Sequence, residues 1–270
     1  AKKENAFSEF TIFDDPDATK EEIEIYRKEC LSISDWEREY LVKFTIDINR
    51  AIIPEWKKEF EGTLKKDEFY EYYSAYLGMD LGIRDKTVVL FSYYDFNNGT
   101  LCIVDEVVMH GAALTTDKLA LAVKEKEKRN FPEKKTFRYS DNNNPLLLQD
   151  LSLNYQLVFS PTTKTSLESM VNKVRIWVKN GRIRVSEKCT ELLGCLGNGI
   201  WKENRKDFDR SSVFGHFDAL AALIYLVRNV NESHNPIPKL HKIGHDTHWI
   251  NEDFKKTETH KALKGLFKRR

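Results

Sequence analysis

A single aspartate inside a short apolar stretch constrains this chain more than any other feature. The stretch YLGMDLG at 76–82 is bounded by turn residues, which predicts a buried β-strand with Asp80 in its middle. A lone carboxylate is costly to bury unless a cation meets it. Gly78 and Gly82 flank Asp80, so we expect little side-chain bulk to block an approaching ligand. Taken alone, Asp80 is as consistent with a structural role, as a turn cap or the partner of a buried arginine, as with contact to a ligand.

The overall composition excludes several classes of protein. The chain has 270 residues, 41% of them hydrophobic, which is enough for one large domain with a sizeable core. Its net charge of +1 gives no indication of a polyanionic partner. The four cysteines have no CxxC spacing, which indicates reduced thiols and neither a disulfide framework nor a zinc site. No apolar run approaches the roughly 18 residues of a membrane span, and no secretory signal pattern opens the chain.

The pattern of elements predicts a main domain at 73–230. Three strands are expected in quick succession at 75–81, 86–95 and 100–109, with Asn97-Asn98-Gly99 as the second turn. Further strands are expected at 136–140, 156–160 and 182–185, and helices at 117–129, 145–151, 166–179, 187–196 and 215–230. This order predicts an α/β fold with a mixed central sheet, antiparallel in its first three strands, parallel further on, and flanked by helices.

The segments on either side of this domain differ from it in composition. Residues 1–72 are largely polar or charged, with a helix pattern at 19–32, and we expect them to form an N-terminal attachment and linker. Residues 231–270 hold five of the seven histidines and end in LKGLFKRR, and we expect a flexible C-terminal tail. The chain begins at Ala1 without a methionine, so we expect a fragment of a longer protein.

Two further aspartates are expected to converge on Asp80. Asp141 follows the strand at 136–140, and strand ends are where α/β folds place ligands. Asp218 lies in the first turns of a helix that is apolar nearly all round and therefore buried. We expect its carboxylate to face a specific partner. Three carboxylates at one point repel one another, and divalent ions relieve that repulsion. All-oxygen ligands favour Mg²⁺ or Mn²⁺, and carboxylates that bridge two such ions support phosphodiester hydrolysis.

Several of these motifs together resemble a known family. GMDLG, YSDNNNP, KTSLESMVNKVRIWV and GHFDALAALIYL are similar to the nuclease domain of large terminase subunits, the DNA-packaging motors of tailed bacteriophages. The resemblance covers roughly 73–230. It implies an RNase H-like fold and a metal-dependent endonuclease that cuts concatemeric viral double-stranded DNA with two Mg²⁺ or Mn²⁺ ions.

The resemblance also implies roles for particular residues and for partners. Asp80, Asp141 and Asp218 correspond to catalytic metal ligands, and Asp85 falls near a fourth acidic position used by some members. Residues 34–54 are similar to the end of the family's ATPase domain. No GxxxxGK[ST] loop occurs in the chain, so we expect no ATPase activity from it. The implied partners are double-stranded DNA, the portal, the small terminase subunit and the ATPase part of the same motor, in the host cell cytoplasm.

Basic residues near these motifs are candidates for contact with DNA. His216 precedes Asp218 by two residues, so a helix would not bring the two side chains onto one face. An ordinary polar role at the start of the helix fits His216 as well as a phosphate contact does. The remaining DNA-binding candidates, each of which also fits an ordinary solvated surface, are Lys164, Arg182, Arg184, Lys202 and Arg205.

Two other functions remain open at this stage. One is another RNase H-like nuclease of the resolvase or transposase type, which would lack the ATPase-like segment. The other is a non-catalytic module that binds DNA or docks on a motor. Cleavage of plasmid DNA in the presence of a divalent metal separates an enzyme from such a module.

Overall fold

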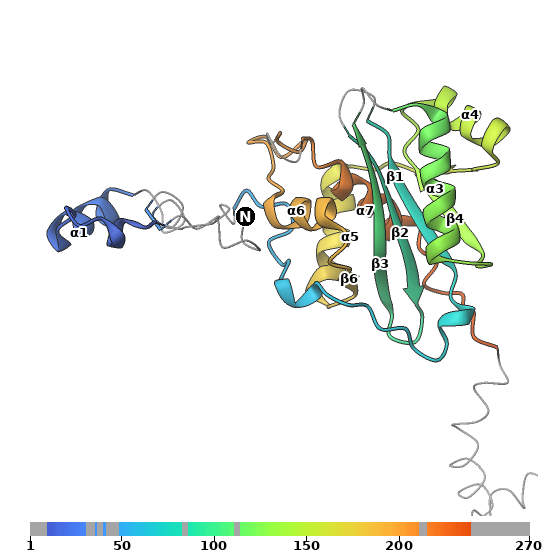
Figure 1. Cartoon of the computed structure of the whole chain (residues 1–270), viewed down its shortest axis with the longest axis horizontal. Coiled ribbons are helices and arrows are strands. Elements are labelled where there is room, and N and C mark those ends of the chain that lie inside the picture. Colours follow the sequence, from blue (N-terminus) through green and yellow to red (C-terminus); the bar gives the residue numbers. More distant parts are fainter. Residues whose placement is uncertain are drawn as a thin grey trace, which may run out of the picture.

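The centre of the protein is a mixed six-stranded sheet with helices on both faces (Figure 1). The computed structural model describes residues 10–30, 36, 40–41, 49–82, 86–110, 114–210 and 215–238. The strands are β1 (Ala75–Asp80), β2 (Lys86–Asp95), β3 (Thr100–His110), β4 (Thr136–Ser140), β5 (Ser160–Pro161) and β6 (Ile183–Val185), in the spatial order β5-β4-β1-β2-β3-β6.

The strand pairing confirms the predicted mixed sheet. β1, β2 and β3 pair antiparallel, whereas β4 is parallel to β1, β5 to β4 and β6 to β3. The predicted strand at 156–160 is wrong in its bounds, because the preceding helix continues to Tyr155. Gln156 then ends that helix in the left-handed conformation, so only Ser160 and Pro161 pair with β4.

Two sets of helices cover the two faces of the sheet (Figure 1). One face carries α3 (Thr116–Asn130) and α4 (Pro145–Tyr155), and the other carries α5 (Leu167–Lys179), α6 (Thr190–Asn198) and α7 (Asp218–Asn229). The side chain of Asn144 caps α4 and that of Ser166 caps α5.

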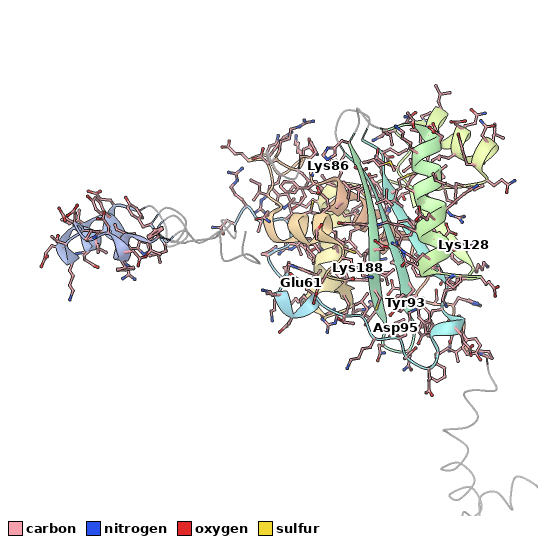
Figure 2. The ribbon with its side chains drawn as sticks, in the orientation of Figure 1. Glu61, Lys86, Tyr93, Asp95, Lys128 and Lys188 are labelled. Carbon is pink, nitrogen blue, oxygen red and sulfur yellow. The ribbon has the colours of Figure 1, made fainter. Side chains whose placement is uncertain are left out.

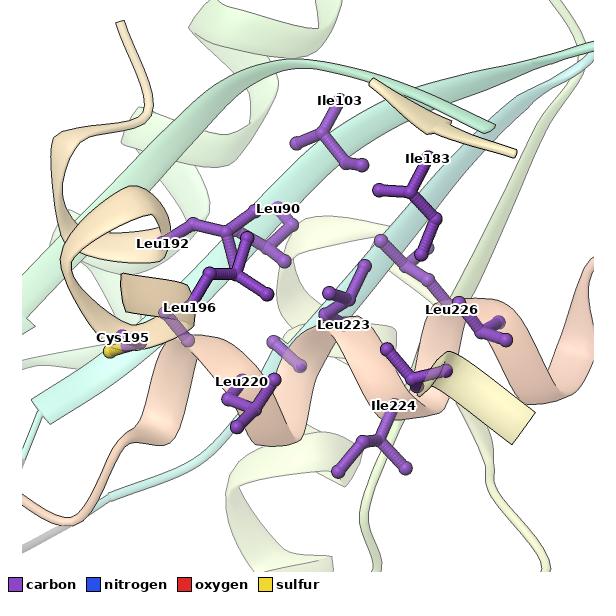
Figure 3. Close-up of a cluster of buried hydrophobic side chains, with 14 of the residues drawn as sticks. Leu90, Ile103, Ile183, Leu192, Cys195, Leu196, Leu220, Leu223, Ile224 and Leu226 are labelled. Atoms are coloured by element: carbon purple, nitrogen blue, oxygen red, sulfur yellow. The ribbon is translucent and has the colours of Figure 1, made fainter. Parts of the chain in front are cut away.

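The last helix, α7, is the centre of the larger core. Nine of its twelve residues are buried, and Leu220, Leu223 and Leu226 meet Leu90 of β2 and Ile103 of β3 (Figure 3). Such a helix is apolar almost all round because it is covered by the sheet on one side and by other helices elsewhere. Its N-terminal residue, Asp218, is therefore held firmly against the sheet.

The chain before β1 contributes to the same core. Ile52, Ile53 and Phe60 are buried with the helices of this face, and bridges join Ala51 to Ile200 and Glu61 to Val185. Residues 51–61 therefore pack on the main domain.

Short elements complete the described part of the chain. They are the 3₁₀ turns η2 (Ile12–Asp14), η3 (Lys58–Phe60) and η4 (Tyr70–Tyr72), and the helix α1 (Lys20–Glu29), which lies to the side of the sheet in Figure 1. A capping box between Thr19 and Glu22 begins α1. None of the helices in the described ranges is long and apolar enough to span a membrane. Most of the predicted tail from 231 onward lies outside the described residues.

Candidate active site

Two adjacent parallel strands end on aspartates at the same edge of the sheet. β1 ends at Asp80, and Asp141 directly follows β4. The last aligned pair between these strands is Met79 with Ser140, so the next residue of each strand is Asp80 and Asp141. The prediction that Asp80 lies in the middle of a strand is wrong, because β1 stops there and continues into Leu81 and Gly82 outside the sheet. The carboxyl ends of parallel strands share one edge, so the two carboxylates are neighbours.

The third aspartate reaches this edge from the far end of the sequence. Asp218 is the first residue of α7, and Phe217 before it adopts a left-handed conformation that turns the chain into the helix. Oδ2 of Asp218 accepts a hydrogen bond of 3.2 Å from the backbone N–H of Lys86, the first residue of β2. Because Val88 of β2 pairs with Asp80, this contact places Asp218 close to the end of β1.

The flanking glycines have a role other than the predicted one. A Cβ on Gly78 would lie 2.5 Å from the carbonyl oxygen of Ala222 and from Cγ of Leu226, both in α7. A Cβ on Gly82 would lie 2.3 Å from the carbonyl oxygen of Lys86. Both glycines therefore make room for protein backbone, and the expectation that they open a path for a ligand is wrong. Gly78 in particular lets α7 approach β1 closely enough to bring its residues to Asp80.

Asp141 is an unusual buried carboxylate. Its side chain has no exposed surface, and neither carboxylate oxygen accepts a hydrogen bond of good geometry. The nearest cation is Nζ of Lys164, 3.6 Å from Oδ2, which is an ion pair and too long for a hydrogen bond. Burial raises the pKa of Asp141. The charge of Lys164 and polar contacts from Lys164 and Asn143 partly oppose that rise. A buried carboxylate with no well-formed hydrogen bond is costly in a folded protein, and its oxygens fit the binding of a cation.

Asp80 lies in the electrostatic field of the other two aspartates. Its side chain keeps some exposure to solvent, yet burial is the main cause that raises its pKa, and the charges of Asp141 and Asp218 raise it further. Oδ1 of Asp80 accepts a hydrogen bond of 3.3 Å from the hydroxyl of Tyr225, two turns along α7 from Asp218. The predicted convergence of Asp80, Asp141 and Asp218 on one edge is therefore what the fold produces.

The donor set of this edge fits a hard divalent ion. Among the described residues, no three His, Cys, Asp or Glu side chains have the mutual geometry to hold a metal ion as they stand. The oxygens that would serve, however, are carboxylates only, and two buried oxygens such as those of Asp141 are what Mg²⁺ or Mn²⁺ prefers. The fourth predicted ligand, Asp85, lies outside the described residues, between Gly82 and Lys86.

Lys164 is the predicted DNA-binding residue that lies beside the carboxylates. It precedes α5 in a loop that Arg228 holds through a 3.2 Å bond to the hydroxyl of Thr165. Nζ of Lys164 also donates to Oδ1 of Asn143 at 3.3 Å, which keeps it close to Asp141.

Two other basic candidates, Lys202 and His216, lie beside a different aspartate. Nζ of Lys202 and Nε2 of His216 are 3.0 Å and 3.6 Å from Oδ2 of Asp207 in the loop at 201–210. Arg205 of the same loop donates to the backbone carbonyl of Asn49. A bridge between Trp201 and Phe208 makes this loop a short ribbon. Its basic side chains are thus partly committed to contacts within the protein.

Arg182 and Arg184 lie near the opposite end of the sheet. Arg184 pairs through Cys102 and Tyr93 with Ala75, five residues before Asp80, which corresponds to about 17 Å along the strands. Figure 2 shows the two ends through Lys86 and Asp95, the first and last residues of β2. Arg182 stacks on Trp177 and donates to Gly99 and Tyr94. The position of these arginines depends on the pairing of β6 with the start of β3. That pairing joins residues far apart in the chain, so local sequence patterns do not reveal it.

Solved structures share this architecture. The large terminase of a thermophilic bacteriophage matches with a TM-score of 0.55 at 16% identity, over 82% of this chain and 55% of that chain. The complex of the same terminase with ADP gives a TM-score of 0.56, again at 16% identity, over 82% and 54%. The nuclease domain of the P22 large terminase matches with a TM-score of 0.52 at 13% identity, over 65% of this chain and 89% of that domain.

These likenesses establish the fold. No protein-family model and no curated protein sequence matches the chain. The mixed sheet is that of the terminase nuclease domains, which confirms the expected RNase H-like architecture. The chain spans about half the length of the thermophilic-phage terminase structures that it matches.

Proposed function

We propose that this chain is a metal-dependent endonuclease, the nuclease part of a large terminase. The observation that carries the proposal is the buried carboxylate of Asp141, which accepts no hydrogen bond of good geometry and lies beside Asp80 at the edge that Asp218 also reaches. The likeness of the fold to the P22 large terminase nuclease domain supports the same conclusion. Each of these aspartates alone has an ordinary structural explanation, whereas their convergence on one edge does not.

Asp80, Asp141 and Asp218 would hold two divalent ions, with Asp85 as a further candidate. Such ions supply Lewis-acid stabilisation of the phosphate and a water of lowered pKa when they are bound. The protein contributes the fixed positions of the carboxylates, through the strand ends and through the close contact of α7 with Gly78. Lys164 contributes a positive charge beside Asp141 and would meet a phosphate of the substrate.

The proposed substrate is concatemeric viral double-stranded DNA, cut during genome packaging in the host cell cytoplasm. The proposed partners are the portal, the small terminase subunit and the ATPase part of the motor. The absence of a GxxxxGK[ST] loop from the sequence supports the proposal that ATP hydrolysis belongs to another part of that motor.

Plasmid cleavage tests this proposal. The full chain is incubated with supercoiled plasmid and Mn²⁺, Mg²⁺ or EDTA, and we expect nicking and linearisation with a metal and none with EDTA. Replacing Asp80, Asp141 or Asp218 singly by Asn should abolish cleavage, because a neutral amide leaves the ions short of negative charge. Asp150→Asn is the matched control, since this aspartate lies on α4 and bonds only Asn154 among the described contacts.

The same assay separates the alternatives. Undiminished cleavage by the three site variants would reject the assignment of the site. Binding of DNA without cleavage under any metal would favour a non-catalytic module. Preference for branched DNA over linear duplex would favour a nuclease of the resolvase type.

A further inference from the structure

Tyr225 lies in the candidate site, although its sequence context is that of an ordinary core residue. It lies in the apolar helix α7, and only 6% of its surface is exposed. Its hydroxyl donates to Oδ1 of Asp80 at 3.3 Å, the one side-chain hydrogen bond that Asp80 accepts within the described part of the chain. Because seven residues separate Tyr225 from Asp218, both side chains lie on the same face of the helix, two turns apart.

We infer that Tyr225 is a positioning residue that fixes the orientation of Asp80 for metal binding. This inference rests on the proposed function. A phenol at neutral pH is a donor, so a bond to Oδ1 leaves Oδ2 and the remaining lone pairs of Asp80 available to an ion. Hydrogen bonds that orient metal-ligating groups typically change metal affinity by about 10–100-fold when they are removed.

The packing of α7 explains why Tyr225 can hold Asp80 firmly. The close approach of Ala222 and Leu226 to Gly78 fixes the helix against β1 on both sides of Tyr225 in the sequence. Figure 3 shows the neighbouring leucines of α7 enclosed by the core. Asn229 donates to the backbone carbonyl of Tyr225 at 2.7 Å and to the hydroxyl of Thr162 at 3.0 Å. These contacts tie the helix to the strand and to the loop before α5.

The ring of Tyr225 also lies between two charged groups of the site. Nζ of Lys164 is 5.8 Å from the centroid of the ring, while the hydroxyl of the same ring bonds Asp80. Lys164 in turn lies 3.6 Å from Oδ2 of Asp141. One tyrosine thus donates to Asp80 and supports the cation beside Asp141, which a purely apolar core residue would not do.

Titration of the full chain with Mn²⁺ in a calorimeter tests this inference without measuring cleavage. Tyr225→Phe keeps the ring and removes only the hydroxyl, and we expect a Kd for Mn²⁺ that is weaker by about tenfold or more. The matched control is Tyr93→Phe, since Tyr93 is also buried and its hydroxyl donates to the carbonyl of Lys65, near the other end of β2. The control should bind Mn²⁺ as the wild type does.

The outcomes separate the inference from the function on which it rests. Equal Mn²⁺ affinity of Tyr225→Phe and wild type would overturn the role of Tyr225 and leave the nuclease proposal intact. Equal loss of affinity in Tyr225→Phe and Tyr93→Phe would also overturn it, because a general loosening of the core would then be the cause. A wild-type chain that binds no Mn²⁺ would reject the proposed function itself, and this inference with it.

Discussion

Gly78 and Ala222 define how closely the last helix meets the central strand. A Cβ added to Gly78 would lie 2.5 Å from the carbonyl oxygen of Ala222, which is far inside normal contact. We expect Gly78→Ala to push α7 away from β1 and to destabilise the fold by about 1–3 kcal/mol, the usual cost of overpacking. Urea unfolding in EDTA measures the free energy, and Mn²⁺ titration should show weakened binding, because Asp218 and Tyr225 move with the helix.

Gly197→Ala is the control for this substitution. Gly197 lies in α6, and a Cβ there would meet nothing within 4 Å. Alanine is the better helix former by roughly 1 kcal/mol, so this variant should be as stable as the wild type or more stable. Equal effects of the two substitutions would contradict the close contact between α7 and β1.

Replacement of Asp141 should stabilise the metal-free protein. The buried carboxylate accepts no hydrogen bond of good geometry and its pKa is raised by burial, so its charged form costs free energy at neutral pH. Asp141→Asn removes that charge, and its unfolding free energy in EDTA should exceed that of the wild type at neutral pH. Added Mn²⁺ should stabilise the wild type and not the variant.

The stability advantage of Asp141→Asn over the wild type should depend on pH, because the pKa of Asp141 is raised in the folded protein. A carboxyl with a raised folded pKa destabilises the fold fully above that pKa, and the destabilisation fades as pH falls from the folded pKa to the unfolded pKa. The advantage of Asp141→Asn in EDTA should therefore shrink as pH falls through the raised pKa toward about 4, the ordinary value. Thermal unfolding at a series of pH values measures it, and an advantage that grows on acidification would contradict the assignment.

Lys164 should compete with the metal for Asp141. Lys164→Met removes the cation 3.6 Å from Oδ2, so the repulsion among the carboxylates grows in the metal-free protein. We expect the free energy of unfolding in EDTA to fall by only about 1 kcal/mol, because Lys164 is partly exposed and solvent screens its charge. Mn²⁺ should bind more tightly to the variant, although cleavage should fall if the lysine meets a phosphate. A weaker Mn²⁺ affinity would show that Lys164 supports the metal site instead.

Asp105 provides a prediction for the opposite face of the sheet. Burial raises its pKa, but hydrogen bonds from Lys126, Asn130 and Arg129 outweigh that effect and lower the pKa to about 2. Its folded pKa lies below its unfolded value, so the stabilisation is complete above about pH 4 and is lost as pH falls toward 2. The shift corresponds to about 2 kcal/mol at neutral pH.

The free energy of unfolding of Asp105→Asn should therefore be about 2 kcal/mol below that of the wild type at neutral pH. Below about pH 2 the two should be equal. Urea unfolding across this range measures the difference. Asp150→Asn should show no such window, and a constant deficit at every pH would contradict the ion-pair explanation.

The sequence predicts the elements of this fold far better than their contacts. Alternating and helical periodicity locates β2, β3, α3 and α7 to within a few residues, because local patterning dominates these elements. The end of α4 is mistaken, since the left-handed Gln156 has no strong local signal. The pairing of β4 with β1, which makes Asp141 a neighbour of Asp80, depends on contacts between distant residues and is invisible to local reasoning.

The candidate site shows the same division. The three aspartates can be found from sequence, because carboxylates in apolar surroundings are costly and conspicuous. Tyr225 is missed, although its spacing of seven from Asp218 in an apolar helix is a usable signal. Gly78 is misread, because only the packed structure shows that a helix backbone occupies the space beside it.

Crystals of the full chain soaked in MnCl₂ test the central claim most directly, through the anomalous scattering of Mn²⁺. The account predicts anomalous peaks within coordination distance of the carboxylate oxygens of Asp80, Asp141 and Asp218, with both oxygens of Asp141 facing a ligand. Anomalous peaks only at other residues, or no peak at this edge of the sheet at saturating Mn²⁺, would contradict it.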